Sequence, residues 1–186
     1  MLANDEDWEI VMKQIQEDKK SAEHYLLCYE QEMKQYAREL TESMHGRHPD
    51  GNVGGGRGNL PGNPVEAQAF ATIKFNEHYE PYLWLRSVEV VMKKLSKQKK
   101  LFLRLRREAY QKHKCYKGKE AWVVYVQQRY AEEHSAKGSR AATLGERTAS
   151  IWWRGIVQFT IDVHHCFEIR KNFFSDDAVF SRFSVL

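Results

Sequence analysis

Residues 45–63 contain most of the helix-breaking residues of this chain. These are Gly46, Pro49, Gly51, Gly54, Gly55, Gly56, Gly58, Pro61 and Gly62. In a helix interior, Gly costs about 1 kcal/mol and Pro about 3 kcal/mol relative to Ala, so no helix is expected to cross this stretch. The chain of 186 residues has only 4 Pro in all, and long segments on either side lack any breaker. We therefore predict an all-α fold, a helical bundle with a Gly-rich loop between its N-terminal helices.

Two helices are predicted before this loop. In residues 5–20, apolar side chains at three- and four-residue steps form one face, namely Trp8, Val11, Met12 and Ile15. Ser21 is expected to start a second helix that runs to about Met44. Its apolar residues follow a seven-residue repeat, Leu26, Tyr29, Met33, Tyr36 and Leu40. We expect this repeat to pack against another long helix, in the same chain or in a partner subunit.

Five further helical segments are predicted after the loop. Asn63 and Pro64 form a typical helix start, and Pro81 should kink or end that helix. The helical pattern resumes at Tyr82, and Ser96 can cap a basic helix with Phe102, Leu105 and Ala109 inward. The next helix, about residues 121–133, should bury Trp122, Tyr125, Val126 and Tyr130. The last, from 145 to about 171, carries an apolar stripe of Ala149, Trp152, Ile156, Phe159, Val163 and Cys166.

These elements suggest five consecutive regions. They are N-terminal helices (1–45), the Gly-rich loop (46–63), a kinked helix region (64–95), a C-terminal helical region (96–171) and an apolar tail (172–186). The tail carries Phe174, Phe180 and Phe183, so we expect it to dock on the body or on a partner.

The charge distribution points to an anionic partner. The net charge is only +4, yet residues 93–119 hold twelve Lys and Arg against Glu108 alone. A local basic block on an otherwise acidic chain favours a phosphate partner more than the net charge does. A Lys-rich solvated helix is the ordinary alternative, and we weigh the two equally.

The order of the C-terminal elements matches a helix-turn-helix preceded by a support helix. Residues 96–113 would be the support helix, 119–133 the first motif helix, and 145 onward a long recognition helix. Three residues on the outer side of its first turns would face base edges, Arg147, Ser150 and Arg154. Four cations would hold phosphates, Lys112, Lys114, Lys119 and Arg140. A core helix with a solvated Arg face would give a similar pattern, and Trp153 is left open between core, surface and groove contact.

Other kinds of site have weak support. Residues 52–59 resemble a phosphate-binding loop but lack a Walker Lys-Ser/Thr pair and a preceding strand. His164, His165 and Cys166 are consecutive, so on a helix they point to different faces and grip one ion poorly. No catalytic triad or paired carboxylates stand out. We therefore expect no enzyme activity, no metal and no cofactor.

The chain also resembles a known family. The loop Asp50-Gly51-Asn52-Val53-Gly54-Gly55, the helix opening Asn63-Pro64-Val65-Glu66-Ala67 and the segment Glu146-Arg147-Thr148-Ala149 follow an N-terminal helix ending near Met44. This order resembles the RinA-type and ArpU-type late-gene transcription activators of bacteriophages, whose last helix is like region 4 of bacterial sigma factors. The resemblance implies Glu146, Arg147, Ser150 and Arg154 as DNA-reading positions. It also implies a phage promoter region and host RNA polymerase as partners.

We thus expect a transcription activator of phage or prophage late genes that binds double-stranded DNA. The N-terminal helices and residues 64–95 would supply a homodimer or polymerase contact. No run of about 18 apolar residues and no signal peptide is present, so we expect no membrane partner and a cytoplasmic location in the bacterial host cell. Three separate cysteines, Cys28, Cys115 and Cys166, fit reduced thiols. Two alternatives stay open, a ring-forming DNA-binding protein of the small terminase type and a helical protein-protein adaptor.

Overall fold

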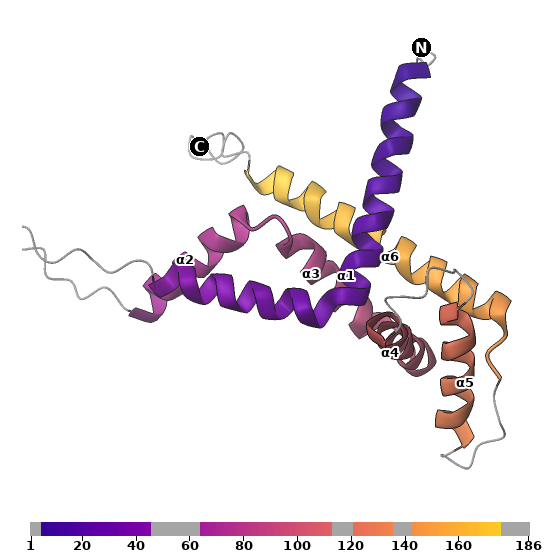
Figure 1. The fold of residues 1–186 in the computed structure, drawn as a ribbon. Coiled ribbons are helices and arrows are strands. Elements are labelled where there is room, and N and C mark those ends of the chain that lie inside the picture. The colour runs from indigo at the N-terminus through magenta and orange to yellow at the C-terminus, as the bar shows by residue number, and fades with distance from the viewer. Residues whose placement is uncertain (1–4, 46–63, 113–120, 136–142, 176–186) are drawn as a thin grey trace, which may run out of the picture.

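The computed structural model describes residues 5–45, 64–112, 121–135 and 143–175, and these residues form six α-helices with no strand among them. The helices are α1 (Asp5–His45), α2 (Pro64–His78), α3 (Tyr82–Lys94), α4 (Lys97–Lys112), α5 (Ala121–Ser135) and α6 (Glu146–Ser175). Figure 1 shows α3 and α6 near the centre, with α1 crossing them and α4 and α5 at the N-terminal end of α6. The expected all-α fold class is confirmed for the described residues.

One prediction, that of two separate N-terminal helices, is wrong. Residues 5–45 form a single helix, α1, and no new helix starts at Ser21. Ser costs a helix interior only about 0.5 kcal/mol, and the next residue, Ala22, is fully buried against the body. Figure 1 shows α1 bent part-way along, so that its N-terminal half stands away from the other helices. The Leu26 carbonyl in the middle of α1 accepts a hydrogen bond of 2.7 Å from Arg107 Nε, and side chains that bond to helix carbonyls accompany such bends.

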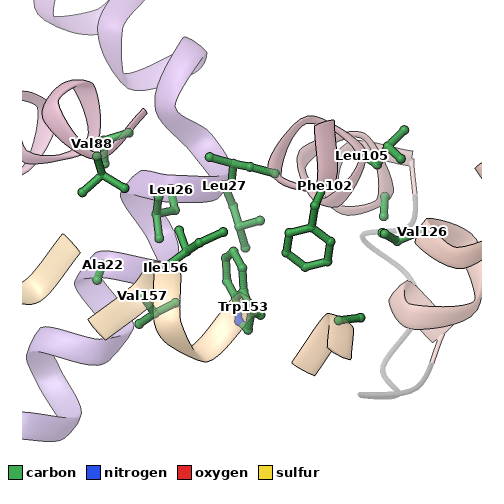
Figure 2. Packing of buried hydrophobic residues seen from close by; sticks show 14 of the residues in the cluster. Ala22, Leu26, Leu27, Val88, Phe102, Leu105, Val126, Trp153, Ile156 and Val157 are labelled. Carbon is green, nitrogen blue, oxygen red and sulfur yellow. The ribbon is translucent and has the colours of Figure 1, made fainter. Parts of the chain in front are cut away.

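One apolar core joins α1, α3 and α6 to α4 and α5. Leu26, Val88 and Ile156 are almost completely buried where α1, α3 and α6 meet. Phe102 of α4 extends the same core toward α5, and Figure 2 shows Leu27 and Trp153 beside this ring. The start of α6 is therefore held by the same core as the rest of the molecule.

The second half of α1 packs against α2 and α3 of the same chain. The Tyr36 ring lies 5.9 Å from the ring of Phe75, 5.5 Å from that of Tyr79 and 6.0 Å from that of Tyr82. The Tyr36 hydroxyl also donates to Asn76 Oδ1 at 2.7 Å. These contacts give the seven-residue repeat an intramolecular partner.

The helix starts and stops around Pro81 agree with the sequence. The second helix begins at Pro64 and ends at His78, and the third begins directly after Pro81. Ser96 Oγ accepts from the Lys99 backbone N–H at 3.4 Å, which is the expected cap of α4.

The buried face of α6 differs from the predicted stripe. Phe159 and Cys166 are exposed and Trp152 is only half-buried, whereas Trp153 is buried. The buried face includes two polar residues that the pattern did not count, Thr160 and His164. Thr160 Oγ1 donates to the Ile156 carbonyl at 2.8 Å, and the His164 ring stacks on Trp84 at 3.6 Å. The buried face of α6 is therefore turned toward Trp153 and away from Phe159, with His164 held by its contact with Trp84.

Candidate nucleic-acid interface

An aromatic cluster fixes α5 and the start of α6 on α4. The Phe102 ring lies 5.8 Å from the ring of Trp152 and 6.2 Å from that of Trp122. Tyr130 contacts Trp152 from α5 with ring centroids 6.4 Å apart. The predicted inward face of α5 is confirmed, since Val126 and Tyr130 are buried and Trp122 and Tyr125 are half-buried.

The segment before the start of α6 is held by a hydrogen bond from a side chain of α5. Gln127 Nε2 donates to the Leu144 carbonyl at 2.8 Å, and the Leu144 side chain is itself buried. The helix then begins with a bond of 2.9 Å from the Ala149 N–H to the Gly145 carbonyl. A Cβ atom on Gly145 would meet only Thr148 Oγ1, at 3.8 Å, so this position does not require Gly. The first turns of α6 are therefore set by α5.

The proposed base-reading residues lie on these first turns. Glu146, Arg147 and Arg154 are exposed, while Ser150 is half-buried at the margin of the packed face. Among the described residues, neither arginine has a carboxylate within ion-pair distance, and Arg154 Nε makes only a long contact of 3.4 Å with the Ser150 carbonyl. Both guanidinium groups are thus available to a partner.

The proposed phosphate-binding residues are placed only in part. Lys112 is exposed at the end of α4, where its Nζ donates to Glu108 at 2.7 Å and contacts the Tyr125 hydroxyl at 3.3 Å. The hydrogen bonds to Glu108 and Tyr125 raise the pKa of Lys112, so it carries its charge at neutral pH. Lys114, Lys119 and Arg140 lie outside the described residues.

Two other cations of the basic block bind within the chain. Arg104 pairs with Glu133 of α5 at 2.6 Å. Arg107 donates to the Leu26 carbonyl, and its guanidinium lies 5.2 Å from the Tyr29 ring centroid. Arg104 and Arg107 therefore contribute to helix packing within the chain.

A groove of about 740 Å³ runs beside the same turns of α6. Its lining from α6 includes Glu146, Ser150 and Arg154, and α1 contributes Ile15 and Lys19. Arg147 does not line the groove. Three of the four predicted reading residues therefore line the groove, and Arg147 lies outside it.

Arg106 lies in this groove between two tryptophans and was not singled out as a site residue by the sequence. Its guanidinium carbon is 4.4 Å from the Trp122 ring centroid and 5.0 Å from that of Trp153. The Nε atom is buried without a hydrogen-bond partner among the described residues. Burial lowers the pKa of Arg106 from its ordinary value to about 10, so the group stays charged at pH 7. Arg106, Trp122 and Trp153 are far apart in the sequence, so no local pattern predicts that they meet.

The two histidines of α6 have partners within the chain. His164 stacks on Trp84, while its neighbour His165 turns away and contacts Asp18 Oδ2 at 2.8 Å. Within the described ranges, no three His, Cys, Asp or Glu side chains are grouped to hold a metal ion. None of the described helices is both long and apolar enough to cross a membrane.

Comparisons with known proteins do not assign a family. No protein-family model, curated protein or solved structure matches the chain. The function is therefore argued from the site alone.

Proposed function

We propose that this protein binds double-stranded DNA through the first turns of α6, with α4 and α5 as supports. The observation that carries the proposal is the pair Arg147 and Arg154. Among the described residues of α4 and α5, Arg104, Arg107 and Arg129 are all engaged with acceptors of the chain. Arg147 and Arg154 are exposed and have no acidic partner within the part of the chain that the structure describes.

The spacing of this pair suits a groove of DNA. Seven residues correspond to two helical turns and about 10 Å along the axis, so both arginines lie on one side of α6. The major groove is about 12 Å wide and admits an α-helix, and bidentate Arg-to-guanine contacts are the commonest specific ones.

The biological role follows from the resemblance described above. We propose a transcription activator of phage or prophage late genes that works with host RNA polymerase. In this proposal Glu146, Arg147, Ser150 and Arg154 read the promoter, and Lys112, Lys114, Lys119 and Arg140 hold phosphates. Phosphate contacts position the protein without reading sequence.

The test is a DNA-binding titration of single variants. Arg147→Ala and Arg154→Ala should each lose about 1–3 kcal/mol of binding to the specific site, with little change on random duplex. Lys112→Ala should weaken binding to all DNA alike. Arg38→Ala is the matched control, since it removes the same charge from an exposed position of α1 far along the chain from α6. Equal losses on specific and random DNA for Arg147→Ala would refute its reading role.

One observation favours a second candidate, the protein-protein adaptor. Arg104, Arg107 and Lys112 of the basic block already have partners in the chain, which lowers the charge available for phosphates. An adaptor would retain its partner after nuclease treatment and would bind no DNA at low salt.

A further inference from the structure

The groove that contains Arg106 has one wall from α6 and another from α1. Arg106 lies beside Trp153 of α6. From there, Val157 and Ile161 continue the α6 wall over the next two turns, about 12 Å along the helix axis. Ile15 of α1 lines the same groove. The groove, of about 740 Å³, therefore combines a guanidinium group with an adjoining apolar wall.

The guanidinium of Arg106 has hydrogen-bond donors but no acceptor among the described residues. Only its Nε is enclosed, so the two terminal nitrogens reach the open space of the groove that the side chain lines. The rings of Trp122 and Trp153 lie 6.4 Å apart and are tilted by 56°, so they form a corner around the guanidinium and do not enclose it. A polar group in such surroundings usually has a partner in folded proteins. The terminal N–H groups are thus free to bond a ligand in the groove.

The two carboxylates that line the groove do not pair with this guanidinium. Burial lowers the pKa of Arg106 and Glu23 of α1 opposes this effect, yet the two side chains form no ion pair in the described part of the chain. Glu146 opens α6, about 10 Å along the helix axis from the turn beside Arg106. Two further cations line the same groove, Lys19 and Arg154. An anion in the groove would therefore meet one guanidinium without an acceptor and two additional positive charges.

These features favour a small anion that carries an apolar body. A guanidinium bonds a carboxylate through two parallel N–H donors, and these charge-assisted hydrogen bonds are stronger than neutral ones. Inorganic phosphate would use the cations but leave Val157 and Ile161 uncovered. A neutral apolar compound would cover this wall but leave the donors of Arg106 unused. The volume of the groove lies within the range of small-molecule sites, which are mostly apolar with a few polar groups that fix the ligand.

We propose that the groove binds a small organic carboxylate with an aromatic or alkyl body. The carboxylate accepts hydrogen bonds from the terminal nitrogens of Arg106. The body of the ligand lies along Val157 and Ile161, with Ile15 of α1 on the opposite side. This site does not depend on DNA binding, and its test needs no DNA.

The test is isothermal titration calorimetry of the full chain with cinnamate and with cinnamamide, which has the same apolar body and no charge. Cinnamate should bind with a dissociation constant of about 1 mM or lower, the scale for a ligand of this size. Cinnamamide should bind at least about 10-fold more weakly, because it lacks the charge-assisted hydrogen bonds. Arg106→Met should weaken cinnamate by at least about 10-fold and leave cinnamamide unchanged, since Met removes the donors and keeps most of the apolar length. Circular dichroism checks that the variant keeps its helix content.

Two further variants sharpen the test. Arg104→Met is the matched control, because it makes the same substitution on α4 at a side chain that pairs with Glu133 and does not line the groove, and it should leave cinnamate binding unchanged. Glu23→Gln should tighten cinnamate binding by roughly 2- to 5-fold, since it removes a negative charge near Arg106.

Three results would overturn the proposal. The first is the absence of cinnamate binding, or equal binding of cinnamate and cinnamamide. The second is cinnamate binding that Arg106→Met leaves intact. The third is inorganic phosphate that binds as tightly as cinnamate, since a site for phosphate groups or nucleic acid would not use the apolar wall.

Discussion

Replacing Arg106 with Met should make the folded protein more stable, although it removes a charged side chain from the centre of a groove. The guanidinium lies between Trp122 and Trp153 with one nitrogen buried and unpartnered. Burial lowers the pKa of Arg106 to about 10 although Glu23 favours the charged form, and against an ordinary value of about 12.5 this corresponds to roughly 3 kcal/mol of net penalty on the charge. The cation–π contacts of the guanidinium with the two Trp rings offset about 2 kcal/mol of this penalty. Since Met keeps most of the apolar length, we expect Arg106→Met to raise the free energy of unfolding by roughly 1 kcal/mol.

The neighbouring residue supplies the control. Arg107 is also half-buried, but its Nε donates to the Leu26 carbonyl at 2.7 Å. Arg107→Met removes this bond and should lower the free energy of unfolding by about 1–3 kcal/mol. Urea denaturation followed by circular dichroism, at one protein concentration, measures both variants. If Arg106→Met lowers the free energy of unfolding by more than about 1 kcal/mol, the ring contacts outweigh the desolvation cost and this reasoning is refuted.

Two further predictions concern α6. Gly155→Ala should raise the free energy of unfolding by about 0.5–1 kcal/mol, because Ala favours a helix interior and a Cβ atom there meets nothing within 4 Å; a lower thermal midpoint would contradict this. Burial lowers the pKa of His164, so the folded state keeps this ring neutral while the unfolded chain protonates near its ordinary pKa of about 6.5. Its contribution to stability is therefore present above that pH and is lost as the pH falls. Between pH 7.5 and 5.5, wild-type protein should lose more stability than His164→Gln in urea denaturation, and equal losses would exclude His164 as the cause.

The positions of the helices were predictable because their signals are local. Pro64, Pro81 and Ser96 determine helix ends through backbone sterics and capping, and the structure agrees at each. The inward residues of α4, such as Phe102 and Leu105, followed from periodicity alone. Ser21 was misread as a boundary, because its small propensity cost is outweighed by the burial of Ala22.

The orientation of α6 and the groove around Arg106 could not be predicted from the sequence, because both depend on contacts between distant residues. Which face of α6 is buried depends on Trp84, eighty residues earlier, which gives His164 a stacking partner. Arg106 became part of a groove because Trp122 and Trp153 reach it from two other helices.

The most direct test of the DNA-binding proposal is a salt-series titration with two duplexes of equal length. One duplex carries the DNA that flanks the coding sequence, and the other has random sequence. We expect clear preference for the flanking DNA and a linear fall of log K with log salt, with a slope of roughly −4 if the four proposed cations each neutralise a phosphate. No binding of either duplex at low salt would contradict the proposal and leave the adaptor as the better account.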